Sequence, residues 1–321
     1  MQKDVVLEKR KKTQSGLKIV TCILAFIPIA ALLGIILNLL LKSGVAIHTA
    51  GWSLFSTTFY PAKGSYGLLP AIWGTFLVAL VAMIIAAPVS LCLAFLANDF
   101  SIGFLSAVVR WALGVLSGIP PIIIAAMAPI IFELFIWPKF AGKGLPEPVL
   151  LKMAPYSALP LNGSTLLGGI LLSLLVIPFL APLIDDVIKN IPHTLKEASF
   201  SLGANRWHTL WSVTMPYSVS GLSSALMLGI LTAIGESVIV AFTIGIGASH
   251  LPNPLFDILK STGPLTTDIV EFAAGGFSPA ANGQLLTSIG NFAGLMLLLV
   301  AFAILGISTY LQSGFKKRFT Q

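Results

Sequence analysis

Residues 190–218 read NIPHTLKEASFSLGANRWHTLWSVTMPYS, a polar stretch inside a strongly apolar chain. Of the 321 residues, 56% are hydrophobic and only 10% are charged, and the mean hydropathy is +0.94. Uncharged runs flank the stretch on both sides, over residues 153–184 and 209–235. The pattern predicts a loop between two membrane-crossing segments, and we call residues 190–216 the elbow.

The apolar runs are long enough to be transmembrane helices, which need about 20 residues each. Backbone inside a bilayer must satisfy its own hydrogen bonds, and the runs do not alternate as the strands of a membrane barrel do. The sequence therefore predicts an all-α membrane protein with a retained first helix. One membrane domain, 18–313, is expected between basic segments at 1–17 and 314–321. Its six transmembrane helices are predicted at residues 18–41, 69–97, 106–136, 164–184, 217–246 and 285–313.

The distribution of basic residues predicts the orientation of these helices. Cytoplasmic loops carry an excess of Lys and Arg. With the N-terminus inside, six of the 19 Lys and Arg residues fall in outer segments: Lys42, Lys63, Lys139, Lys143, Lys152 and Lys260. The other thirteen fall inside, so both termini and the elbow are predicted to be cytoplasmic. The same flanking positions explain the net charge of +7 without a nucleic-acid partner.

Within the elbow, the sequence predicts two short helices joined by a turn. Pro192 suits the first turn of a helix, and Gly203 suits the left-handed residue that ends one. Asn205 is a good N-cap for the second helix, and Pro216 marks entry to the fifth span. Two roles remain open on these grounds. The elbow either lies on lipid headgroups or presents a helix to a groove of a cytoplasmic partner.

The spacing of residues in the elbow resembles the coupling signature of ABC-importer permeases. That signature is Glu-Ala-Ala, three residues, Gly, nine residues, Ile, any residue, Leu-Pro. Here Glu197-Ala198-Ser199, Gly203 and Val213-Thr214-Met215-Pro216 match every step, with conservative changes at three positions. The resemblance implies that this loop docks into a separate ATP-hydrolysing subunit. Glu197 and Ala198 would anchor the loop, Gly203 would form its turn, and Pro216 would close the motif.

The resemblance extends over nearly the whole chain, to the phosphate-importer permeases and to their PstC type in particular. The similar segments are GLLPAIWGTFLVALVAMIIAAPVSLCLAFLAND (67–99), LSGIPPIIIA (116–125), LMLGILTAIGESVIVAFTIG (226–245) and GPLTTDIVEFAAG (263–275). It implies a type I ABC-importer permease fold in the cell membrane. It also implies a second permease, two ATPase copies that bind ATP and Mg²⁺, and an extracytoplasmic phosphate-binding protein as partners. The chain itself would bind no cofactor.

Glu236 is the charged residue that the membrane interpretation must explain. An acid at the centre of a membrane helix costs on the order of 3 kcal/mol, and such residues usually face a bundle interior or a watery path. A structural carboxyl hydrogen-bonded to a neighbouring helix is the alternative. In the family, an Arg sits one helical turn before this Glu, and here that residue is Thr232. Either the partner permease supplies the missing cation or the ion is another oxyanion.

Other residues give weaker indications. Ser117, beside Gly118 and the Pro120-Pro121 pair, is a third candidate for the path. Arg110 and Glu133 lie near span ends, where snorkelling to the membrane surface explains them. The sequence contains no catalytic residue set, no metal-ligand spacing and no Walker A loop, so the chain is not expected to be an enzyme.

Two other function classes compete with the importer permease. An ion-coupled secondary transporter would use Glu236 as a proton site and transport without an ATPase. An assembly or anchoring protein with no path would leave the cost of Glu236 unexplained.

Overall fold

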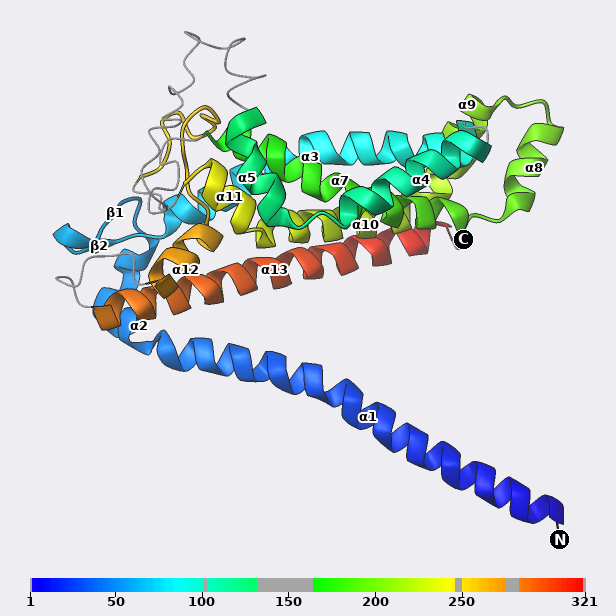
Figure 1. The fold of residues 1–321 in the computed structure, drawn as a ribbon, viewed down its shortest axis with the longest axis horizontal. Helices are drawn as coiled ribbons and strands as arrows, with labels where there is room; N and C mark the ends of the chain where they lie inside the picture. The colour runs from blue at the N-terminus through cyan, green and yellow to red at the C-terminus, as the bar shows by residue number, and fades with distance from the viewer. Residues whose placement is uncertain (1, 101–102, 132–163, 246–249, 275–282, 320–321) are drawn as a thin grey trace.

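The structure is a computed structural model that describes residues 2–100, 103–131, 164–245, 250–274 and 283–319. Most of its helices run along one long axis, and α8 and α9 of the elbow lie at one end (Figure 1). The long helices are α1 (Gln2–Lys42), α3 (Leu69–Phe95), α7 (Thr165–Lys189), α10 (Met215–Gly235) and α13 (Gly283–Phe319). The short helices are α2 (Gly44–Ala50), α4 (Gly103–Ser117), α5 (Pro121–Ile131), α8 (His193–Ser201), α9 (Arg206–Thr209), α11 (Val238–Thr243) and α12 (Leu265–Ala274).

Smaller elements complete the described chain. Strands β1 (Phe59–Tyr60) and β2 (Ser65–Tyr66) form an antiparallel hairpin at the end opposite the elbow (Figure 1). Single 3₁₀ turns cover Gly51–Phe55 and Pro61–Lys63, and π-helical turns cover Leu96–Phe100 and Leu210–Thr214. The prediction of an all-α membrane protein is confirmed, with this small hairpin as its one addition in the described residues.

Five helical stretches among the described residues are long and apolar enough to cross a membrane. They are Thr21–Phe55, Leu69–Phe100, Thr165–Lys189, Arg206–Gly235 and Gly283–Tyr310. These correspond to five of the six predicted spans. The predicted segments 1–17 and 314–321 are not separated from the spans by a break, because α1 begins at Gln2 and α13 continues to Phe319.

Two predicted spans are interrupted. The third, 106–136, divides into α4 and α5 around Gly118–Pro120, and its last part lies outside the described residues. A proline disfavours the helical conformation in the residue before it, which explains a break at Pro120-Pro121. The fifth span divides at Glu236, whose backbone is extended with φ −72° and ψ 126°. Glu236 therefore lies at the end of α10 and not in the middle of a helix, which corrects the prediction for it.

The core lies where α3, α7 and α10 pack together. Its fully buried residues include Ala82, Leu172, Val176, Leu180 and Ile184. A side chain at Gly169 on α7 would overlap Val81 on α3, so glycine at this position lets the two helices approach closely. The two interrupted spans thus pack beside α7, which runs without a break from Thr165 to Lys189.

Helix α1 diverges from the bundle, and none of its most apolar part is buried (Figure 1). The hydroxyl of Ser288 on α13 holds its end by donating to the Lys42 carbonyl at 2.7 Å and accepting from the Ala46 N–H at 2.8 Å. The start of α1 and the end of α13 both lie at the elbow's end of the long axis (Figure 1).

Candidate functional site: the elbow and the cavity

The elbow turns at Gly203, as the sequence predicts. Gly203 has a φ of +84°, in the left-handed region that glycine adopts without a steric penalty. Its N–H donates to the Phe200 carbonyl at 2.9 Å, and the Ala204 N–H donates to the Ser199 carbonyl at 3.1 Å. The side chain of Asn205 then accepts from the His208 N–H at 2.7 Å, which confirms Asn205 as an N-cap.

The second short helix of the elbow is not a separate element, which corrects the helix–turn–helix prediction. Helix α9 continues through the π-helical turn Leu210–Thr214 directly into α10, so residues 206–235 form one helical stretch. Pro216 lies in the first turn of α10, after the π-helical turn. A displacement of the elbow at Asn205 therefore acts on the end of a membrane-crossing helix.

The outer surface of the elbow is exposed. Glu197, Ala198 and Gly203 are all exposed, and Leu202 is 90% exposed although it is a large apolar residue. A hollow of about 440 Å³ lies beside them, lined by Ser199, Leu202, Gly203, Ala204, Asn205 and His208. A single exposed leucine is common on protein surfaces, so the hollow and the leucine do not by themselves identify a binding site.

The inner side of the elbow is bound to the π-helical turn Leu96–Phe100, which we call the π-turn. Lys196 Nζ lies 2.6 Å from Asp99 Oδ1, and both side chains are largely buried. The Arg206 guanidinium donates to the Asp99 carbonyl at 3.2 Å, and the rings of Trp207 and Phe100 lie 5.9 Å apart. Sequence reasoning missed Asp99, because its partners are about a hundred residues away.

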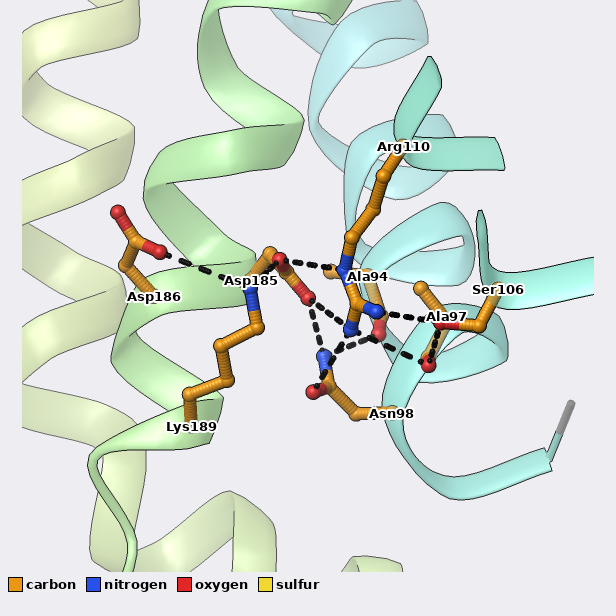
Figure 2. A network of polar contacts seen from close by, with 8 residues as sticks. All are labelled: Ala94, Ala97, Asn98, Ser106, Arg110, Asp185, Asp186 and Lys189. Carbon is orange, nitrogen blue, oxygen red and sulfur yellow. Dashed lines mark hydrogen bonds and ion pairs between the residues drawn. The ribbon is translucent and has the colours of Figure 1, made fainter. Parts of the chain in front are cut away.

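A second polar cluster joins the π-turn to α4 and α7 (Figure 2). Arg110 on α4 donates from Nε to Asp185 Oδ2 at 3.1 Å and from Nη2 to Asp185 Oδ1 at 3.2 Å. The Asn98 amide donates to the same carboxylate at 2.5 Å, and Lys189 also donates to it. We call Asn98, Arg110, Asp185 and Lys189 the clamp. Arg110 thus has an ion-pair partner within the protein, which the snorkelling interpretation did not predict, although its side chain stays 39% exposed.

The three residues predicted to lie on the path line one cavity. It has a volume of about 440 Å³ and lies at both helix interruptions, between the α4–α5 break, α7 and the end of α10. Ser117, Thr232 and Glu236 all line it. The Ser117 hydroxyl donates to the Gly114 carbonyl at 2.9 Å, and the Thr232 hydroxyl donates to the Leu228 carbonyl at 3.0 Å. Both hydroxyl oxygens keep lone pairs that can accept a hydrogen bond. Glu133 lies outside the described residues.

The titratable side chains of this cavity are acidic. Its lining, taken over the described residues, includes the carboxyls of Glu236 and Asp186 but no Lys or Arg. The backbone carbonyl of Glu236 accepts from the Thr266 hydroxyl at 3.0 Å, which holds the interruption against α12. The side chain of Glu236 has no hydrogen bond to a neighbouring helix among the described contacts, so the structural-carboxyl alternative gains no support.

The family model described as "binding-protein-dependent transport system inner membrane component" matches residues 90–317, which include the π-turn, the cavity and the elbow. The chain belongs to this family. Its members are transport components, so the prediction of a transport subunit rather than an enzyme is confirmed. The chain is a multi-pass membrane protein of the permease type.

Similar permeases include two named phosphate transport system permease protein PstC. The protein of Xylella fastidiosa (strain Temecula1) is 32% identical over 296 residues, covering 90% of this chain and 87% of its own. That of Pasteurella multocida (strain Pm70) is 31% identical, with 92% and 89% covered. The resemblance predicted from the sequence is thereby confirmed.

Two solved structures support the fold alone. A bacterial alginate ABC transporter, in complex with an alginate-bound periplasmic protein, has a TM-score of 0.55 and 18% identity, covering 89% of this chain and 93% of its own. The MetNI methionine ABC transporter, in inward-facing conformations, has a TM-score of 0.53 and 17% identity, with 78% and 94% covered. The predicted type I ABC-importer permease fold is confirmed.

Proposed function

We propose that this chain is one of two permease subunits of an ATP-driven importer for inorganic phosphate. The observation that carries the proposal is the cavity at the paired helix interruptions, where Ser117, Thr232 and Glu236 meet in a chain related to PstC proteins over most of its length. Irregular backbone inside a membrane is tolerated where it lines a cavity. The cavity is then half of the translocation path.

The negative lining of the cavity determines what the second permease must supply. A phosphate ion is repelled by a bare carboxylate, and of the two acids in the described lining only Asp186 has a cation nearby, Lys189 at 3.9 Å. The hydroxyls of Ser117 and Thr232 can orient an oxyanion but carry no charge. We infer that cations on the second permease complete the site, in place of the arginine that the family carries at the position of Thr232.

The elbow is the proposed contact with the ATPase. Glu197, Ala198 and Gly203 form an exposed surface beside the hollow, and Pro216 lies in the helix that continues from it. ATP and Mg²⁺ would bind to two ATPase copies, and this chain would hydrolyse nothing. The elbow's end of the bundle, where both chain ends lie, is then cytoplasmic, and a phosphate-binding protein delivers the ion at the opposite end (Figure 1).

Reconstitution of the complete importer in proteoliposomes tests this function. ATP inside the vesicles with binding protein outside should drive uptake of labelled phosphate, and arsenate should compete while sulfate does not. Uptake of sulfate or molybdate in place of phosphate would assign another oxyanion. Uptake by this chain alone, abolished by an uncoupler and independent of ATP, would instead establish the secondary transporter.

A further inference from the structure

The π-turn is bound on two sides by residues from different parts of the fold. On one side, Asp99 holds Lys196 and Arg206 of the elbow. On the other side, the next residue, Asn98, donates to Asp185 of the clamp. Five residues of wide helical turn thus connect the elbow with the pair of helices α4 and α7. Single π-helical turns inside α-helices frequently occur at functional sites.

The clamp fixes α4, α7 and the π-turn to one another. Asp185 is 7% exposed and accepts from Arg110, Asn98 and Lys189. Arg110 also donates to Ser106 Oγ at 2.5 Å and to the Ala97 carbonyl of the π-turn at 3.3 Å. A buried carboxylate with a bidentate arginine has a narrow geometry, so a shift of any one element is transmitted to the others.

Both helices held by the clamp are walls of the cavity. Ser117 lies seven residues after Arg110 on α4, which is about 10 Å along a helix. Asp186, the residue next to Asp185 on α7, is itself part of the lining. The clamp therefore lies between the elbow and the cavity, and it reaches the cavity wall through Lys189, whose Nζ lies 3.9 Å from Asp186 Oδ1.

We propose that Asn98, Arg110 and Asp185 are positioning residues that convert movement of the elbow into movement of the α4 and α7 walls of the cavity. This proposal rests on the proposed function, since it requires an ATPase that moves the elbow. The competing explanation is a purely structural one, in which the clamp only stabilises the fold. The two differ in the ratio of transport to ATP hydrolysis, which a structural role does not change.

The main experiment measures phosphate uptake and ATP hydrolysis together on the complete importer in proteoliposomes. Asn98→Leu is the first variant, because it removes the side-chain link between the π-turn and Asp185, while the Arg110–Asp185 pair and the Arg110 bond to the Ala97 carbonyl remain. Asp185→Asn and Lys196→Gln follow, at the clamp and at the elbow. Asp257→Asn is the matched control, since it breaks the Lys260–Asp257 ion pair of 3.1 Å outside the clamp.

The proposal expects the clamp variants to assemble and to hydrolyse ATP, with uptake per ATP reduced about two- to thirtyfold, the range seen for residues that carry coupling between sites. The control should keep the ratio. Lys196→Gln combined with Asn98→Leu should lose no more than the larger single loss, because both variants interrupt one connection. An unchanged ratio in both Asn98→Leu and Asp185→Asn, or purely additive losses in the double variant, would overturn the proposal.

A readout without phosphate separates this proposal from the proposed function. Ser117→Cys, in a chain with Cys22 and Cys92 replaced by Ser, can be labelled with a thiol reagent in the presence and absence of ATP. The labelling rate should change with ATP in the parent, and Asn98→Leu should abolish that change. If Asn98→Leu leaves the ATP response intact, the clamp does not transmit movement, whatever ion the importer carries.

Discussion

The elbow end and the cavity differ in how their charged side chains are paired. At the elbow end, the cations Lys196, Arg110 and Lys189 each contact a carboxylate, and Asp185 and Asp99 are largely buried among their donors. In the cavity, the lining drawn from the described residues holds Glu236 and Asp186 but no cation, and Asp186 is paired only with Lys189 of the clamp, at 3.9 Å. One region pairs its cations with carboxylates of this chain, although Asp99 Oδ2 is buried without a hydrogen bond to a described residue, and the other lacks a cation in its described lining.

The difference indicates how each region works. Buried ion pairs with several hydrogen bonds have a specific geometry, and breaking one partner leaves a costly unpaired charge. The elbow end is therefore suited to move as a unit. An incomplete cavity is suited to a shared site, where the second half of the chemistry arrives with another subunit. The following predictions test this contrast, beginning with the largest effect.

Gly203→Val should cause the largest loss. A side chain at Gly203 meets nothing within 4 Å, so the effect comes from the left-handed backbone and from docking of the elbow. The left-handed conformation costs a branched residue roughly 1–2 kcal/mol, which favours other turn conformations by about five- to thirtyfold, and ATP-driven uptake should fall with the fraction of elbows that keep the native turn. Gly203→Asn is the control, because Asn tolerates this conformation. Normal uptake by an inserted Gly203→Val protein would contradict the coupling role of the elbow.

Glu236→Gln should have the second largest effect, and it acts in the cavity alone. Removal of the carboxyl changes the charge of the lining without changing the side-chain volume. We expect the rate of phosphate uptake to change about tenfold, while the rate of ATP hydrolysis stays as in the parent importer. This result is typical of a group that contacts the transported ion. Parallel measurement of phosphate uptake and ATP hydrolysis checks this. An assembled Glu236→Gln importer with unchanged uptake would remove Glu236 from the path.

Local features of the elbow could be predicted from the sequence, because short-range rules determine them. Gly203 ends α8 and Asn205 caps α9, as the residue types require. The apolar runs predicted the spans, and Ser117 and Glu236, which the sequence singled out, line the same cavity. The signals for the interruptions were also present, in Pro120-Pro121 and in a charge inside an apolar run, but an uncharged run does not reveal where its helix breaks.

The ion pairs could not be predicted in the same way. Arg110 and Asp185 are 75 residues apart, and Lys196 and Asp99 are 97 apart, so only the packing of α3, α4 and α7 brings them together. In the sequence, each of these residues is near a span end, where the membrane surface explains a charge equally well. The helical continuation of α9 into α10 was missed because Pro216 suggested a new start, whereas the π-helical turn lies before it.

Thr232→Arg tests whether the cavity lacks a cation. The change places a cation one helical turn before Glu236, and residues four apart share a helix face. Because the cavity is half-open, the gain is that of a partly exposed pair, about 0.2–1 kcal/mol. The apparent KM for phosphate should fall up to about fivefold. Thr232→Val, which has the shape of Thr without the hydroxyl, is the control, and a KM that rises in Thr232→Arg would contradict a shortage of cations in the site.

Ser199→Ala should give the smallest effect. Ser199 Oγ lies 2.9 Å from Thr209 Oγ1, across the turn of the elbow, and the family signature has alanine at this position. The loss of one such hydrogen bond costs about 0.5–1.5 kcal/mol of local stability. Amide hydrogen exchange should therefore accelerate around Gly203, while uptake changes by less than about threefold, because the clamp and the Lys196–Asp99 pair remain. If Ser199→Ala instead abolished coupling, the rigidity of the elbow would depend on the turn itself and not on its ion pairs with the π-turn.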